Sequence, residues 1–211
     1  MRNFRTIKDN SSYEVSIKKS RFICHLKRTE TEEDAQRFIE ELKKEHWKAN
    51  HNCHAYIIGE NDDIQRASDD GEPSGTAGLP MLEVLKKKQL KNVTAVVTRY
   101  FGGVKLGASG LIRAYGHTTS EAIEEIGIVE KQLHQFISLE VSYPMSGKIQ
   151  NLLYQKPYRV EDIDYTDTVT FNCLIPAEQV QSFYEETTEW TNAQASYKEG
   201  QKAWIEVDVT D

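Results

Sequence analysis

The sequence predicts an α+β protein with two domains. Apolar residues alternate in some short segments and recur with helical spacing in others, so strands and helices are interspersed along the chain. This pattern ends at Gly127 and starts again after it, where the charge also changes. Residues 1–128 carry a net charge of +1 and residues 129–211 a net charge of −8. We therefore expect one domain over residues 1–128 and a second over residues 129–211.

In the first domain the expected elements alternate between strand and helix. Thr31 and Asp34 resemble a capping box, and Thr76 is placed to cap a second helix whose first turn holds Pro80. The third helix is ended by Gly127. The predicted elements are a strand at 22–26, a helix at 32–47, a strand at 53–58, a helix from about 79, a strand at 93–98 and a helix over 111–126.

The second domain is predicted to have a ferredoxin-like order. Its expected elements are a strand at 136–141, a helix at 144–156, strands at 158–163 and 169–173, a helix from Pro176 and a closing strand at 204–209. This is the β-α-β-β-α-β succession of that arrangement.

The composition is that of a soluble globular protein. Hydrophobic residues make up 38% and charged residues 28% of the 211 positions. No apolar run approaches the roughly 20 residues of a membrane helix, and the polar N-terminus does not resemble a signal peptide. We therefore expect a cytoplasmic protein that does not associate with membranes, and we favour a monomer.

The cysteine and histidine pattern predicts neither a metal nor a cofactor. Cys24, Cys53 and Cys173 are odd in number and form no C-x-x-C pair, so free thiols are expected. His51, Cys53 and His54 do not form a convincing zinc set, because Cys53 and His54 point to opposite faces of a strand. The role of His51 and Cys53 stays open.

Two glycine-rich segments, the first at Asp69–Gly78 and the second at Arg99–Gly107, are the most informative feature of the chain. Seven of its twelve glycines lie between Asp69 and Tyr115. Glycine loses more conformational entropy on folding than other residues, so it destabilises a fold where no turn or close approach needs it. This concentration of glycines therefore indicates special backbone geometry. The segment 99–107 follows an apolar run and precedes a helical pattern, where free N–H groups and the helix dipole favour anions. The alternative is a tight corner between a strand and a helix.

Basic and aromatic side chains accompany the second glycine-rich segment. Residues 83–117 hold seven Lys/Arg against Glu83 alone. Arg and Lys suit phosphate, and an exposed aromatic ring can stack on an unpaired base, although buried aromatics are common. The predicted phosphate or nucleic-acid site comprises Arg99, Tyr100, Phe101, Gly102, Gly103, Lys105, Gly107 and Arg113. The lysines at 86–88 are expected to be a solvated helix face.

The first glycine-rich segment carries three carboxylates, Asp69, Asp70 and Glu72. Turn chemistry alone can explain such a loop. The carboxylates could also bind Mg²⁺ or act as acid and base. We favour a third role, in which they pair with Arg99 and Arg113 and hold the two segments together.

Several motifs resemble the IMPACT family, and more narrowly its bacterial branch. They are Ser68–Gly78, Val97–Gly103, Lys105–Gly107, Ser20–Ile23 and His51–Cys53. The chain departs from the family pattern at Ser109, where many members have Gly, and at His54, where an aromatic is usual. The resemblance implies a first domain like the second domain of ribosomal protein S5 and a second domain like the last domain of elongation factor G. It also implies a link to translation, which eukaryotic members regulate through an additional RWD domain.

Three functions fit these observations. The leading hypothesis is a protein that binds nucleic acid, expected to be RNA, and takes part in regulating translation, with RNA or ribosome-associated factors as partners. One alternative is an enzyme acting on a phosphate-bearing small molecule, with carboxylates holding Mg²⁺ and Lys105 neutralising charge. The other is an interaction module whose acidic second domain recognises a basic protein. We favour a role without catalysis, and no catalytic residue is assigned.

Overall fold

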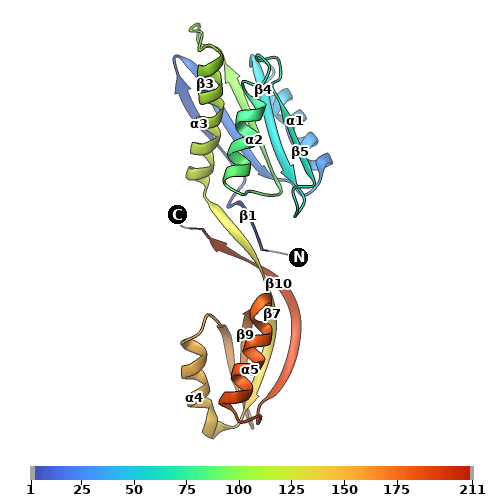
Figure 1. Cartoon of the computed structure of the whole chain (residues 1–211), viewed down its shortest axis with the longest axis vertical. Coiled ribbons are helices and arrows are strands. Elements are labelled where there is room, and N and C mark those ends of the chain that lie inside the picture. The colour runs from blue at the N-terminus through green and yellow to red at the C-terminus, as the bar shows by residue number, and fades with distance from the viewer. Residues whose placement is uncertain (1–2, 210–211) are drawn as a thin grey trace. The chain divides into compact units, whose positions relative to one another are not determined.

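Strands and helices are interspersed throughout residues 3–209, the part of the chain that the computed structural model describes (Figure 1). The predicted α+β class is confirmed, with two sheets and five α-helices in the described residues. The contacts divide the chain into two compact units. One extends to Lys131 and includes the chain again from Glu206, and the other is Gln132–Ile205.

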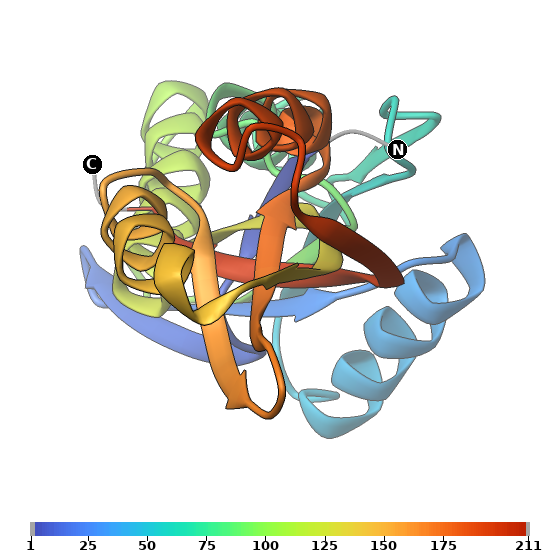
Figure 2. The ribbon, with the colours of Figure 1, turned by 90° about the horizontal axis from the view of Figure 1, so that it is seen from below.

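The first unit is a five-stranded antiparallel sheet with helices on both faces. The strand order is β2-β3-β6-β4-β5. Its strands are β2 (Ser11–Ile17), β3 (Ser20–Arg28), β4 (His51–Ile58), β5 (Ile64–Ser68) and β6 (Val93–Tyr100). Its helices are α1 (Glu32–Glu45), α2 (Gly78–Lys87) and α3 (Ala108–Ile126). Helices α2 and α3 cover one face of this sheet and α1 covers the other (Figures 1 and 2).

The central position of β6 explains its sequence. A strand buried on both faces has a continuous apolar run rather than an alternating one, and all residues of β6 before Tyr100 are buried. Val97 faces the core under α2 and α3, whereas Val96 faces α1. The Thr31 side chain accepts a hydrogen bond of 3.1 Å from the Asp34 N–H at the start of α1, which confirms the predicted cap.

Three strands of the first unit were not predicted: β1 (Phe4–Ile7), β2 and β5. Strands β2 and β5 are the two edges of the sheet, so within residues 3–209 each has one hydrogen-bonded neighbour and exposes many of its side chains. Strand β1 is only four residues long and pairs with the first four residues of β7. Short or exposed strands bury too little apolar surface to leave a clear periodic signal.

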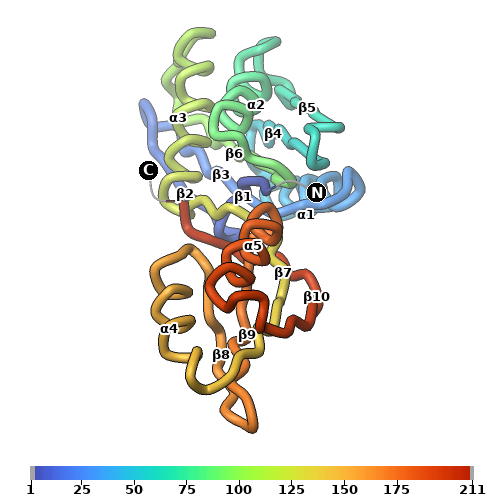
Figure 3. Tube along the Cα trace, turned by 60° about the horizontal axis from the view of Figure 1, so that its bottom comes forward, coloured from blue at the N-terminus to red at the C-terminus, as the bar shows by residue number. Residues whose placement is uncertain are grey.

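The second unit has the ferredoxin-like order that its sequence predicts. Its elements are β7 (Ile128–Val141), α4 (Tyr143–Tyr154), β8 (Arg159–Tyr165), β9 (Val169–Pro176), α5 (Val180–Trp190) and β10 (Ser196–Asp208), with a short 3₁₀ helix (Ala177–Gln179) before α5. In its five-stranded sheet β8 pairs with β9 and β9 with β7, and β7 also pairs with both β10 and β1. Helices α4 and α5 lie on one face of this sheet and share its core (Figure 3).

Strands β7 and β10 begin eight residues earlier than predicted, at Ile128 and Ser196 instead of 136 and 204. The added stretches are rich in charged and amide residues, so no apolar alternation marks them. Cys24, Cys53 and Cys173 are free and buried, as predicted. Over residues 3–209, no helix combines the length and the apolar character that crossing a membrane requires.

Candidate functional site

The two glycine-rich segments meet at one end of the first unit. The first connects β5 to α2 and the second connects β6 to α3. Because β6 lies beside β4, and β4 beside β5, both segments leave the same sheet from nearby strands. They are joined by Arg99, the penultimate residue of β6, and Glu72 of the first segment.

Arg99 and Glu72 form a buried ion pair. The Arg99 Nη1 donates a hydrogen bond of 2.6 Å to Glu72 Oε1, and their side chains are only 7% and 3% exposed. The Tyr115 hydroxyl of α3 donates to the same carboxylate oxygen at 2.7 Å. Burial and the neighbouring Cys53 raise the pKa of Tyr115, so this hydroxyl stays protonated and remains a donor. The predicted pairing of a carboxylate with Arg99 is therefore present.

Asp69 organises the first glycine-rich segment. Its carboxylate accepts hydrogen bonds from the backbone N–H groups of Gly75, Ala77 and Gly78 at 2.8, 3.1 and 2.9 Å. Burial alone would raise the pKa of Asp69, but these three hydrogen bonds outweigh it and hold the pKa below its usual range. Asp69 thus caps α2. The prediction that Thr76 is the cap is wrong, because the Thr76 hydroxyl donates to the Pro73 carbonyl instead.

Asp70 and His51 fix the position of the same segment on β4. Asp70 Oδ2 accepts a hydrogen bond of 2.7 Å from the Asn52 N–H, and the Lys43 ammonium lies 3.4 Å from its other oxygen. His51 Nδ1 lies 2.9 Å from the Asp70 carbonyl oxygen. A carbonyl can only accept, so Nδ1 carries the hydrogen. The other ring nitrogen, Nε2, lies 3.7 Å from Glu72 Oε2.

Cys53 is a buried thiol beside this network. Its Sγ donates to the Asp69 carbonyl, and burial raises the pKa of Cys53 to about 12. A thiol with so high a pKa is a poor nucleophile. Within residues 3–209, no group of three or more His, Cys, Asp or Glu side chains is arranged to hold a metal ion.

The second glycine-rich segment needs glycine for two different reasons. A Cβ atom at Gly102 would lie 1.9 Å from the Lys19 carbonyl oxygen in the β2–β3 turn, so only glycine allows this close approach. Gly107 has φ of 73° and precedes the first turn of α3. Gly103 also has positive φ and is exposed. No side chain caps α3, so the N–H groups of its first turn have no capping partner in the described residues.

A cavity of about 390 Å³ opens where the segments meet. Its lining combines the buried network with the exposed loop: Asn50, His51, Glu72, Pro73, Arg99, Phe101, Lys105, Leu106, Gly107, Ala108 and Leu111. Phe101 is 46% exposed, and the Arg99 guanidinium lies 5.5 Å from the centre of its ring. The cavity therefore has a buried charged floor, apolar walls, and Lys105 with the start of α3 at its edge.

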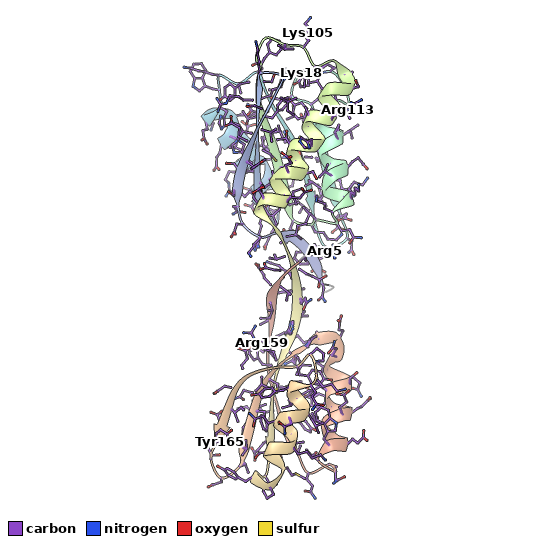
Figure 4. All side chains as sticks on the ribbon, turned by 90° about the vertical axis from the view of Figure 1, so that its left-hand side faces the viewer. Arg5, Lys18, Lys105, Arg113, Arg159 and Tyr165 are labelled. Carbon is purple, nitrogen blue, oxygen red and sulfur yellow. The ribbon has the colours of Figure 1, made fainter. Side chains whose placement is uncertain are left out.

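A second cavity, of about 540 Å³, lies along the adjacent face of α3. Its lining residues are Ile17, Lys18, Leu106, Gly110, Arg113, Ala114 and His117. Leu106 lines both cavities. Lys18, Lys105 and Arg113 are exposed at this end of the unit, whereas Arg5 lies toward its other end (Figure 4).

The predicted site residues thus occupy three environments. Arg99 is buried in its ion pair, and the Tyr100 hydroxyl lies 2.9 Å from His46 Nδ1. Phe101 and Lys105 are exposed at the first cavity. Arg113 lies at the second cavity and pairs with no carboxylate in the described residues, so the expected contact with the acidic segment is absent.

Sequence reasoning missed Lys18 as a site residue. It lies in the β2–β3 turn, and β2 was not predicted. The adjacent basic pair Lys18-Lys19 was the signal available in the sequence. In the structure both residues have positive φ in the tight turn between two strands. Recognising β2 would have placed this turn beside the start of α3.

Comparison with known proteins agrees with this architecture. Residues 18–123 match the Impact N-terminal domain, and residues 139–194 match a domain of unknown function, DUF1949. A solved structure titled "Crystal structure of an hypothetical protein" is 33% identical in sequence and superposes with a TM-score of 0.60. The match covers 93% of this chain and 97% of the chain in that structure.

Bacterial relatives match over most of the chain. IMPACT family member YvyE of Bacillus subtilis is 50% identical over 209 residues, covering 99% of this chain and 96% of the relative. IMPACT family member YigZ of Escherichia coli is 40% identical over 169 residues, covering 79% and 83%. The Protein IMPACT homolog of Dictyostelium discoideum is 35% identical over 130 residues, which are 60% of this chain and 36% of the relative. The chain belongs to the IMPACT family.

Proposed function

We propose that this protein binds RNA through the basic end of its first unit and acts in the regulation of translation. The observation that carries the proposal is the grouping of Lys18, Lys105 and Arg113, all exposed, around two adjoining cavities at the start of α3, which has no side-chain cap in the described part of the chain. Membership of the IMPACT family is consistent with the link to translation. The proposal names RNA as the ligand and ribosome-associated factors as further partners.

Each exposed group has a distinct part in this proposal. Lys18, Lys105 and Arg113 contact phosphates, and Phe101 offers a ring on which an unpaired base can stack. Arg99 does not contact RNA, because its guanidinium is buried against Glu72. Its part is to hold the two segments in place.

We also propose a division of labour between residues 1–128 and residues 129–211. The second region carries a net charge of −8, which repels phosphates from most of its surface. RNA therefore contacts the first region, and the second region suits a basic protein such as a ribosome-associated factor.

The test is RNA binding by the variant K18A/K105A/R113A over a range of salt concentrations. Removing one phosphate-binding side chain should reduce the slope of log affinity against log salt by about 0.7 for a single strand. We expect a weaker complex and a slope smaller by about 2. The matched control is K44A/K87A/K202A, which removes the same charge from exposed lysines elsewhere. If both triple variants fold and lower the RNA affinity equally, only the total charge matters. That result would refute the assignment of RNA binding to this surface.

A further inference from the structure

The cavity between the two glycine-rich segments has the features of a small-molecule site. Its volume of about 390 Å³ falls in the range of such sites, about 300–1,000 Å³. Apolar side chains form its walls, including Pro73, Phe101 and Leu111, and a few polar groups converge on it. This combination is typical of sites that bury an aromatic or apolar ligand and fix it by a polar group.

The polar groups at the cavity favour an anion. The backbone N–H groups at the start of α3 have no side-chain cap among the described residues and carry the positive end of the dipole of a 19-residue helix. Lys105 adds a mobile positive charge at the edge. Glu72 also lines the cavity, but Arg99 compensates its charge at 2.6 Å.

One buried group on the floor points independently to a ligand. Arg99 is 5% exposed and lines the cavity, yet its Nε is buried without a hydrogen-bond partner among the described residues. An unsatisfied donor on a buried cation is costly. His51 also lines the cavity, with its Nδ1 held by the Asp70 carbonyl and its Nε2 3.7 Å from Glu72 Oε2. An anion bound in the cavity would place a negative charge beside the buried Arg99 guanidinium.

We propose that this cavity binds a phosphate monoester that carries a nucleoside. The phosphate lies at the first turn of α3 beside Lys105, and the base stacks on Phe101. The ligand is a free nucleoside monophosphate or the phosphorylated end of an RNA chain, which share this chemistry. The inference goes beyond general RNA binding, because it concerns one terminal phosphate in a cavity and its primary test uses no RNA.

The key variant is Ala108→Asp. Ala108 is exposed in the first turn of α3 and lines the cavity, so an aspartate there places a negative charge where the phosphate should lie. The same aspartate interacts favourably with the helix dipole, so the variant should fold at least as stably as the parent. Lys105→Ala removes the mobile charge, and Lys87→Ala on α2 is the control for removal of one exposed lysine.

Binding is measured by calorimetry and thermal shift with adenosine 5′-monophosphate, adenosine and inorganic phosphate. We expect the monophosphate to bind and raise the melting temperature more than either of the other two. Ala108→Asp should weaken its binding about tenfold or more, because a charge-assisted contact is replaced by repulsion. Lys105→Ala should weaken it less, and Lys87→Ala should leave it unchanged. Absence of binding by the monophosphate, or equal binding by Ala108→Asp, would overturn the proposal.

Short RNAs that differ only in a 5′-phosphate or a 5′-hydroxyl then identify the source of the ligand. If the phosphorylated RNA binds more tightly and Ala108→Asp removes only this difference, the site takes RNA ends. If the two RNAs bind equally while the free monophosphate still binds, the site takes a free nucleotide. If the surface proposed for RNA does not bind RNA, the hydroxyl-ended RNA should bind the parent protein only weakly, and this outcome is independent of the cavity.

Discussion

Arg99 and Glu72 join the two glycine-rich segments through an ion pair of 2.6 Å that is almost completely removed from water. Removing one partner of such a pair leaves an uncompensated buried charge, which typically costs about 3–5 kcal/mol. We expect Glu72→Ala to lower the free energy of unfolding by this amount in denaturant titrations. Tyr115 would also lose its acceptor.

The double variant R99M/E72M provides the control for this pair. If the cost arises from an unpaired charge, removing both charges should restore much of the stability, since apolar replacements of buried pairs are often neutral or stabilising. A double variant less stable than Glu72→Ala would contradict this account.

Asp69 gives a second prediction, on the pH dependence of stability. Three backbone hydrogen bonds lower the pKa of Asp69 in the folded state despite burial. The contribution of Asp69 to the free energy of unfolding is therefore complete above its pKa in the unfolded state and is lost as pH falls through its pKa in the folded state. Asp69→Ala should lower the free energy of unfolding at neutral pH by about 0.5–2 kcal/mol, the usual cost of removing a helix cap. Its stability should also fall less steeply than that of the parent below about pH 4.

Asp167→Ala is the control for the Asp69 variant, because it removes an exposed carboxylate from the β8–β9 turn. It should leave the free energy of unfolding at neutral pH unchanged. If Asp69→Ala is as stable as Asp167→Ala at neutral pH, Asp69 does not act as the cap of α2.

Particular residues show how far the sequence predicts this fold. The buried run Val93–Thr98 and the cap at Thr31 were predicted because burial and capping leave local signals. Strands β2 and β5 were missed because edge strands expose many of their side chains, so no clear apolar alternation marks them. Local reasoning likewise chose Thr76 as a cap, whereas Asp69 reaches α2 from the far side of a turn.

The site was only partly predictable for the same physical reason. A charged residue at the end of a buried strand can be exposed or paired, and only the folded chain brings Glu72 against Arg99 across 27 positions. The glycines marked the right segments, but the neighbour that requires Gly102 is Lys19, far away in the sequence. Residue type indicated the chemistry, and tertiary contacts decided which residues are available for it.

His25 supplies a third prediction. Burial and then the neighbouring His46 lower the pKa of His25 from 6.5 to about 4, and its Nε2 is buried without a hydrogen-bond partner among residues 3–209. Between pH 4 and pH 6.5 the unfolded state therefore binds more protons than the folded state. The contribution of His25 to stability is lost as pH falls from 6.5 toward 4. Replacing His25 with Leu should flatten this part of the stability profile.

Phe101 gives the last prediction, which separates stacking from electrostatics. Its ring is 46% exposed beside Lys105 and rests over the Arg99 guanidinium. Stacking of one base on an aromatic ring contributes about 1–3 kcal/mol, so Phe101→Ala should weaken single-stranded RNA binding by roughly 5- to 160-fold. The salt slope should stay the same, because the phenyl ring neutralises no phosphate. Lys105→Ala should instead lower the slope by about 0.7. An unchanged affinity for Phe101→Ala would exclude base stacking at this ring, and a changed slope would show that the loop carrying Lys105 had moved.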